Sequence, residues 1–213
     1  MAIVTKLEYQ KNNKDRVNVF LDGSFFAGVS LEVVLKFSIK EGNEINQQKL
    51  TEFLFEENKQ KAFQKSTELI SKFVKTEKQI RDYLKTKGFD EKVIEETVEK
   101  LKNYGFIDDR AYVESFVNFK KHVCGAKKIK QELFAKGISN KLIGLVDELM
   151  GESETSACEQ IAQKYMKNKE KTFDNKVKLN RYLLSKGFDF TSVNQVINKI
   201  IKGEDDESWD WFS

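Results

Sequence analysis

Alternation of apolar and polar residues dominates the start of the chain and predicts β-strands. Residues Ile3–Tyr9 and Arg16–Leu21 both follow a period of two, which is typical of strands with one buried face. A polar segment over residues 11–15 separates them, and we expect it to form a turn. The first twenty residues therefore predict two antiparallel strands.

A hairpin and a short helix follow these strands. Asp22-Gly23 is a strong two-residue turn signal, because glycine adopts positive φ at no steric cost. Ser24–Val29 is then the returning strand, and Ser30 suits the N-cap of a helix over Leu31–Phe37. We expect a sheet of three strands, which would be marginal alone and should pack on a helix.

The hydrophobic period changes to 3.6 residues at about residue 47 and remains helical to about residue 201, and an internal repeat lies within this region. Each copy has two apolar residues four apart, then Lys three residues later, Gly, and Phe or Ile. The copies are Ile80–Phe89, Ile129–Ile138 and Leu179–Phe188. Their glycines stand at 88, 137 and 187, so the spacings are 49 and 50 residues.

Each copy predicts a helix that ends at its glycine in the left-handed conformation and is followed by another helix. A further helix is expected before each copy, over 57–73, 109–121 and 153–168. Thr76 and Gln79 have the spacing of a capping box. Asp108 is a suitable N-cap for the helix that follows Gly105.

The fold class that follows is mostly α, with tandem three-helix, helix-turn-helix-like repeats and a small N-terminal antiparallel β segment. Units of this kind that touch mainly their neighbours form solenoids, so we expect an elongated right-handed superhelix. The expected divisions are an N-terminal extension over 1–50, repeats over 51–107, 108–151 and 152–202, and an acidic aromatic tail over 203–213.

Composition limits the class of protein. The 213 residues are 39% hydrophobic and 33% charged, and no apolar run approaches the roughly 20 residues that span a bilayer. The N-terminus has no apolar segment of the kind found in signal peptides. The tail carries five of the 34 acids and no base, so residues 1–202 hold 37 Lys and Arg against 29 acids, a net charge of +8. Such a body favours a negatively charged partner.

Catalytic and metal-binding patterns are missing from the sequence. It contains no Gly-rich phosphate loop and no nucleophile elbow, so we expect neither an enzyme nor a cofactor. His122 is the only histidine and stands in a basic segment. Asp108-Asp109 is better explained by helix capping than by a cation. Cys124 and Cys158 are expected to be small buried hydrophobes in a reducing cytoplasm.

Lysine clusters are the candidate binding groups. They lie over residues 120–136 and 164–186, and either could neutralise phosphates or form a solvated face. Only four arginines occur in the chain, which disfavours base-specific DNA readout. The candidate partner-binding residues are Lys120, Lys121, Lys127, Lys128, Lys130, Lys171, Lys178 and Arg181. The tail is either a disordered or loosely docked end, a segment that folds back on a basic face, or a set of aromatic anchors for a partner.

The repeated motifs resemble those of the bacterial RecX family. The resemblance is carried by Thr76–Phe89, by Tyr104–Tyr112 and by Gly125–Ile138, and it covers about residues 60–200. It implies a non-enzymatic regulator that lies along the filament of RecA recombinase on single-stranded DNA and bridges its protomers. It further implies lower RecA ATP hydrolysis and strand exchange, and either filament loss or blocked filament growth.

Two functions from different classes remain open at this stage. The first is a cytoplasmic protein that regulates recombinase filaments, and thereby recombination and DNA repair. The alternative is a helix-turn-helix-like protein that binds single- or double-stranded DNA directly through its lysines. Nothing in the sequence demands an oligomer, so we expect a monomer, and we expect no membrane contact.

Overall fold

The N-terminal strands form one antiparallel sheet in the computed structural model, which describes residues 1–151 and 153–201. The strands are β1 (Ala2–Gln10), β2 (Asn13–Leu21), β3 (Ser24–Ser30) and the two-residue β4 (Glu44–Ile45). Their order is β3-β2-β1-β4, with all neighbours antiparallel. The predicted three strands are therefore present, and β4 adds a fourth that its two residues were too few to signal.

One of the two predicted hairpin turns is confirmed and the other is shorter than predicted. Asp22 and Gly23 both have positive φ, at 47° and 80°, as the predicted two-residue turn requires. The predicted turn over residues 11–15 is too long. Gln10 pairs with Asn13, so only Lys11 and Asn12 form the turn. The polar residues that suggested a loop lie on an exposed part of β2, where solvent accepts them.

Two helices cover the sheet. Helix α1 (Leu31–Lys36) begins at Ser30, whose hydroxyl accepts a hydrogen bond from the Val33 N–H, as predicted. Helix α2 is continuous over Gln47–Ile70. It begins where the helical period was predicted to begin, at about residue 47, but the bounds 57–73 predicted for the helix before the first repeat are wrong at both ends. The first turns of α2 pack against the sheet. Leu50 is fully buried in the sheet core, and the Phe53 ring lies 5.1 Å from that of Phe37.

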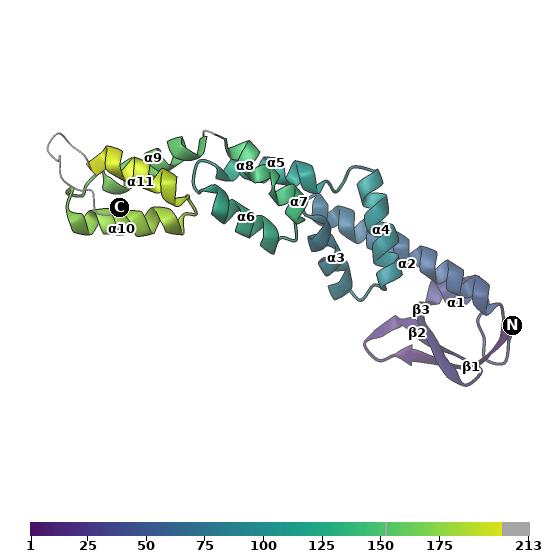
Figure 1. Ribbon diagram of the computed structural model, residues 1–213. Coiled ribbons are helices and arrows are strands. Elements are labelled where there is room, and N and C mark those ends of the chain that lie inside the picture. The colour runs from purple at the N-terminus through teal and green to yellow at the C-terminus, as the bar shows by residue number, and fades with distance from the viewer. Residues whose placement is uncertain (152, 202–213) are drawn as a thin grey trace. The chain divides into compact units, whose positions relative to one another are not determined.

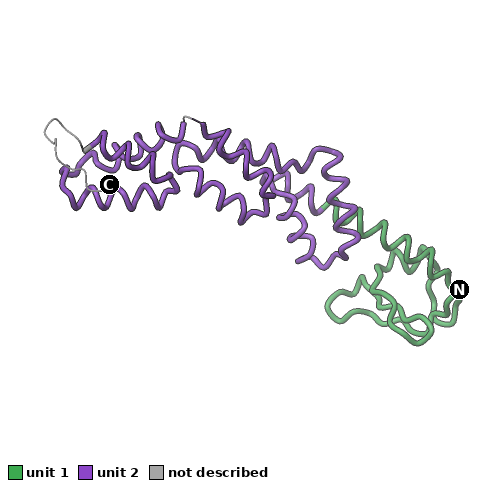
Figure 2. The backbone as a smooth tube through the Cα atoms, viewed as in Figure 1, with its two compact units in different colours: residues 1–64 green, residues 65–213 purple. Residues whose placement is uncertain are grey.

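The chain divides into two compact units, residues 1–64 and 65–213 (Figure 2). The second contains the end of α2 and nine further helices within its described part (Figure 1). Their bounds are α3 Glu77–Thr86, α4 Glu91–Asn103, α5 Asp109–Lys120, α6 Ala126–Ala135, α7 Asn140–Ile143, α8 Leu145–Met150, α9 Ser153–Met166, α10 Phe173–Ser185 and α11 Phe190–Ile201.

These helices form the three predicted repeats. The repeat 1 helices are the last turns of α2 with α3 and α4, repeat 2 contains α5 to α8, and repeat 3 contains α9 to α11. Three predicted helices extended too far at their C-terminal ends, since α2 ends at Ile70, α5 at Lys120 and α9 at Met166. The last helix of repeat 2 is divided into α7 and α8 at Gly144.

The Lys-Gly turns have the predicted geometry. The glycines at 88, 137 and 187 have φ of 79°, 83° and 87°. In each turn the N–H of the residue after Gly donates to the carbonyl five residues earlier, as from Ile138 to Leu133 at 3.1 Å, which is the Schellman arrangement. The capping box of Thr76 with Gln79 and the Asp108 N-cap are also confirmed.

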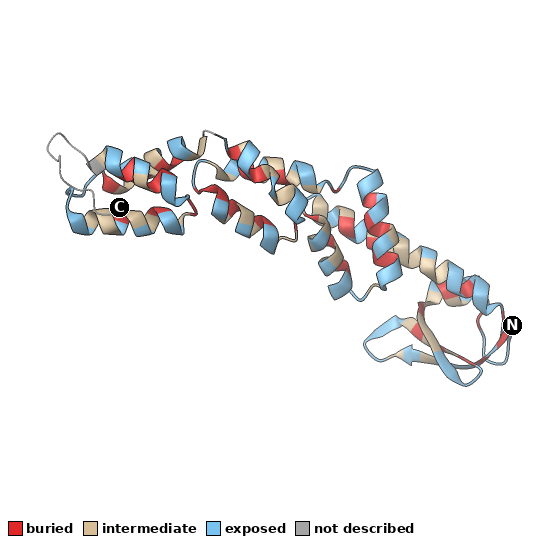
Figure 3. Cartoon of the chain, viewed as in Figure 1, coloured by how far each residue is buried: buried red, intermediate tan, exposed pale blue. Residues whose placement is uncertain are grey.

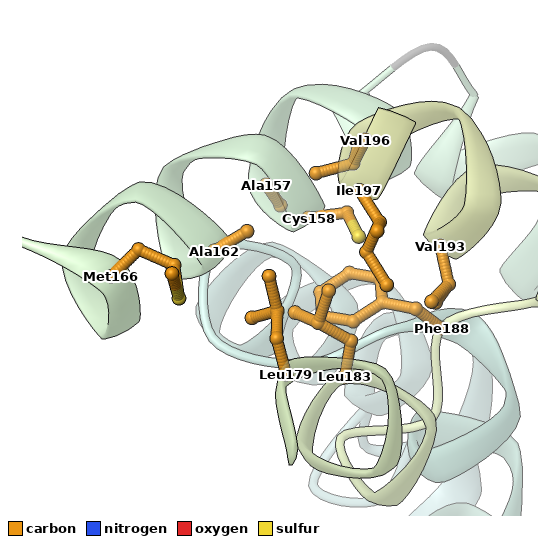
Figure 4. Close-up of a cluster of buried hydrophobic side chains, with 10 residues drawn as sticks. All are labelled: Ala157, Cys158, Ala162, Met166, Leu179, Leu183, Phe188, Val193, Val196 and Ile197. Atoms are coloured by element: carbon orange, nitrogen blue, oxygen red, sulfur yellow. The ribbon is translucent and has the colours of Figure 1, made fainter. Parts of the chain in front are cut away.

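Apolar faces of the helices meet inside each repeat. Buried residues lie on the inward sides of the helices and exposed residues on the outward sides (Figure 3). Figure 4 shows the repeat 3 core, where Phe188 lies beside Leu179, Leu183 and Ile197 and is 1% exposed. Cys158 belongs to this core and Cys124 to that of repeat 2, so both cysteines are buried as expected. No helix in residues 1–151 or 153–201 is long and apolar enough to cross a membrane.

Candidate functional site

The Lys-Gly turns hold the repeats together. At the junction of repeats 2 and 3, the Gly125 N–H donates to the Lys186 carbonyl at 3.0 Å, and the Lys127 N–H donates to the Gly187 carbonyl at 3.2 Å. At the junction of repeats 1 and 2, the Thr76 hydroxyl donates to the Lys136 carbonyl at 2.8 Å. The turns at Gly137 and Gly187 are therefore each bound at the N-terminus of the middle helix in the preceding repeat.

A carboxylate completes each junction. Asp109, at the start of repeat 2, accepts a hydrogen bond from the Glu77 N–H of α3 at 2.9 Å. Glu154, at the start of repeat 3, accepts one from the Ala126 N–H of α6 at the same distance. These N–H groups lack partners within their own helices, and the carboxylates complement the helix dipole. Burial raises the pKa of both Asp109 and Glu154.

An ion-pair network lies beside the first junction. Glu77 bonds Lys102 at 2.5 Å and Arg81 at 2.8 Å, and Arg81 also binds Glu95 through two hydrogen bonds. Burial would raise the pKa of Glu77, but the hydrogen bonds from Lys102 and Arg81 outweigh it and lower that pKa. The network borders a cleft of about 420 Å³, where charges of both signs already compensate one another.

The candidate lysines of repeat 2 have different environments. Lys120 forms an ion pair with Glu132 at 3.0 Å, and Lys130 forms one with Asp147 at 2.6 Å. Lys128 is half-buried, and its backbone lies against Gly187. Lys127 is exposed and has no side-chain partner in the described part of the chain.

Lys127, Lys128 and Lys130 do not share one direction. A helix turns by about 100° per residue, so Lys127 and Lys130 project within about 60° of each other while Lys128 projects to another side. Lys121 is half-buried at the C-cap of α5, and the neighbouring His122 is exposed, as expected.

The repeat 3 candidates are more accessible. Lys171 is exposed in the segment before α10, and Arg181 is exposed on α10. Neither has an ion pair within residues 1–151 and 153–201. Lys178 is loosely paired with Asp174 at 3.9 Å, and both side chains are mostly exposed. Lys178 and Arg181 are three residues apart and lie on one side of α10.

Together these environments separate the eight candidates. Lys127, Lys171 and Arg181 are exposed and free of ion pairs in the described residues, so their charges are available to a partner at low desolvation cost. The charges of Lys120 and Lys130 are compensated by carboxylates. The sequence did not identify Asp109 and Glu154 as junction residues, although each follows within four residues of the glycine that closes the preceding repeat, Gly105 or Gly151.

Comparison with known protein families matches the N-terminal sheet and each of the three repeats. The model for the regulatory protein RecX N-terminal domain matches residues 2–46. The models for the first, second and third three-helix domains of RecX match residues 62–101, 108–144 and 152–197. The four matches follow one another in the order of the N-terminal sheet and the three repeats.

Individual relatives agree over nearly the full length. The chain is 41% identical to the regulatory protein RecX of Clostridium beijerinckii over 97% of its own length and 100% of that protein. It is 35% identical to that of Clostridioides difficile, covering 94% and 97%. A crystal structure of regulatory protein RecX superposes with a TM-score of 0.64 at 26% identity, over 95% of this chain and 99% of that one.

Proposed function

Since this chain belongs to the RecX family of regulatory proteins, we propose that it binds the RecA filament on single-stranded DNA and inhibits filament ATP hydrolysis, strand exchange and extension. The observation that carries the proposal is the family match, which covers the sheet and all three repeats. The protein acts by binding and needs no catalytic group.

The arrangement of tandem repeats supports this mode of action. Repeats that stack on one another spread many modest contacts along a surface. A partner that contacts several protomers of a filament binds the filament more tightly than the free protomer. Only such a difference in affinity can shift an assembly equilibrium.

The exposed, uncompensated cations are the proposed contacts. Lys127, Lys171 and Arg181 come from repeats 2 and 3 and bring positive charge without first breaking an ion pair. A partner surface rich in carboxylates or phosphates would gain electrostatic attraction there, and that attraction falls as salt rises. The other five candidates are proposed to contribute less, because they are paired, half-buried or tied to a junction.

The experiment is a titration of RecA ATP hydrolysis on single-stranded DNA with this protein, using RecA of the same species. The wild type should inhibit at well below one molecule per RecA protomer if it blocks filament growth. The variant Lys127→Glu/Lys171→Glu/Arg181→Glu should need at least about tenfold more protein, a loss of about 1.4 kcal/mol in binding. No inhibition by folded wild type would refute the proposal.

A matched control separates local contacts from net charge. Lys11→Glu/Lys14→Glu/Lys40→Glu changes the net charge equally at exposed positions of residues 1–64. It should inhibit like the wild type. Binding to DNA without RecA distinguishes the alternative function. If the wild type binds DNA alone with a steep salt dependence and the repeat variant loses this binding, the protein acts on DNA directly.

A further inference from the structure

The middle helices of the repeats follow one another in a row. We define the middle-helix row as α10, α6 and α3, the second helix of repeats 3, 2 and 1. The Lys127 N–H at the start of α6 donates to the Gly187 carbonyl just after α10, and Figure 1 shows α10 and α6 one after the other along the same side of the second unit. The last turn of α10 is therefore followed in space by the first turn of α6.

Each middle helix has an outward stripe at the same three positions, which are ten, six and three residues before the glycine of its turn. Residues at these positions project within about 60° of one another on a helix, and all nine are exposed or half-buried. The stripes are Lys78, Asp82 and Lys85 in α3, Lys127, Gln131 and Phe134 in α6, and Val177, Arg181 and Leu184 in α10. The stripe of repeat 1 is charged throughout, whereas those of repeats 2 and 3 combine one cation with a large apolar residue at the last position.

The two apolar side chains at the last position are not needed for folding. Phe134 is 66% exposed and Leu184 is 39% exposed. Among the described residues, neither belongs to the buried cluster of its repeat or to the partly buried side chains that pack on that cluster. Repeat 1 has the exposed Lys85 at the same position, so the fold accepts a charged side chain there.

Available cations share the stripes with these apolar side chains. Lys127 lies two turns before Phe134 on α6, and Arg181 lies one turn before Leu184 on α10. Both cations are exposed and have no ion pair in the described part of the chain. Along the row the order is Arg181, Leu184, Lys127 and Phe134, so cations and apolar groups alternate.

The acids of these two helices do not cancel this charge. Glu132, the only acid of α6, projects to another side of the helix and is paired with Lys120 at 3.0 Å. Asp174, the only acid of α10, is loosely paired with Lys178 at 3.9 Å. The surface is therefore positive as well as apolar, and its electrostatic complement is an acidic surface.

A protein fits this surface better than a nucleic acid does. Exposed aromatic residues beside arginine are typical of the anchors in protein interfaces. Base stacking needs an aromatic ring, but the position of Phe134 is occupied by Leu184 in repeat 3. The property that the two repeats share is apolar volume, which an apolar pocket on a protein complements.

We propose that Phe134 and Leu184 are apolar anchors of the partner-binding surface, and that they insert into a partner protein whose pockets are flanked by carboxylates for Lys127 and Arg181. This inference rests on the proposed function, with RecA of the filament as the partner, and deepens it by naming contacts that are not cationic. Burial of the anchors supplies binding energy that salt does not screen, whereas the attraction of the cations is screened.

The test compares Phe134→Ala and Leu184→Ala with the wild type in the titration of RecA ATP hydrolysis on single-stranded DNA. Half-inhibition should need at least about tenfold more Phe134→Ala and about threefold more Leu184→Ala than wild type. These ratios should stay constant between about 50 and 300 mM salt, whereas the ratio for Lys127→Glu/Lys171→Glu/Arg181→Glu should fall.

Phe119→Ala is the matched control, because Phe119 is 77% exposed on α5 of the same repeat and lies outside the middle-helix row. It should inhibit like the wild type, and far-ultraviolet circular dichroism checks that each variant is folded. If the wild type inhibits and both anchor variants inhibit equally well, this inference is overturned while the proposed function stands. If the folded wild type does not inhibit, the proposed function fails and the anchors fail with it.

Two further outcomes would assign the surface to another occupant. DNA binding by the wild type without RecA that is lost in Phe134→Ala overturns the inference, because the ring would then stack on bases. Self-association of the wild type in analytical ultracentrifugation that is lost in Phe134→Ala also overturns it, because the occupant would then be a second copy.

Discussion

Substitution of Gly187 by alanine tests whether the Lys-Gly turns join the repeats. Gly187 has a φ of 87°, and an added Cβ would lie 2.5 Å from the backbone nitrogen of Lys128 in the preceding repeat. Gly88 is a matched control. It lies at the same position of the equivalent turn in repeat 1 with a φ of 79°, but an added Cβ there would have nothing within 4 Å. The two substitutions thus share the backbone strain and differ in the collision.

The expected losses of stability follow from the backbone strain and the steric collision. Placing alanine in the left-handed region costs about 1–2 kcal/mol, and both variants should lose this amount. Overpacking against a backbone that cannot yield costs about 1–3 kcal/mol more, and only Gly187→Ala should lose it. At about 2–4 °C per kcal/mol for a chain of this size, the melting temperatures of the variants should differ by about 2–12 °C.

Calorimetry of both variants beside the wild type measures the difference. Tandem repeats need not unfold in one step, so amide exchange at Lys127 gives a local readout. This N–H is bonded to the Gly187 carbonyl and should lose protection in Gly187→Ala but not in Gly88→Ala. Equal melting temperatures and unchanged exchange at Lys127 would refute the docking of this turn on repeat 2.

Three further predictions concern buried groups. Burial raises the pKa of Asp109, so the wild type should lose stability relative to Asp109→Asn as pH rises from about 4 through the raised pKa. Urea unfolding of both proteins between pH 4 and 7 measures this difference. A wild type that gains stability relative to Asp109→Asn over this range would contradict the prediction. Burial raises the pKa of the Cys158 thiol to about 11, so an aromatic disulfide reagent should label it at pH 8 only after denaturation, and immediate labelling would argue against the repeat 3 core. Phe188→Ala should cost about 3–5 kcal/mol in denaturant unfolding, whereas Phe134→Ala, at a side chain that is 66% exposed, should stay within about 0.5 kcal/mol.

Local chemistry accounts for what the sequence predicted. The Ser30 and Thr76 caps and the Asp22-Gly23 turn depend on residues within three positions of one another, so a linear pattern contains the complete signal. The same holds for the Lys-Gly turns, where positive φ selects glycine. The helical period from about residue 47 was predicted, but the bounds of α2 were not, because its early apolar residues pack in the sheet core and do not belong to the repeat pattern.

Long-range partners account for what the sequence did not predict. Asp109 bonds a backbone group 32 positions away, and Glu154 one 28 positions away, so their roles exist only once the repeats stack. The neutralisation of Lys120 by Glu132 and of Lys130 by Asp147 has the same origin. Counting lysines therefore overestimated the free positive charge, and only the structure separated the available cations from the compensated ones.

At each junction the capping carboxylate lies later in the sequence than the N–H group it caps, and this order affects folding during synthesis. The N-termini of α3 and α6 are each capped by a carboxylate that is translated later, Asp109 or Glu154. During synthesis from the N-terminus, repeat 1 and repeat 2 each emerge with a donor that stays hydrated until the following repeat is made. Each new repeat thus caps the one before it, and a ribosome that stalls after repeat 2 leaves the N-terminus of α6 without the Glu154 cap.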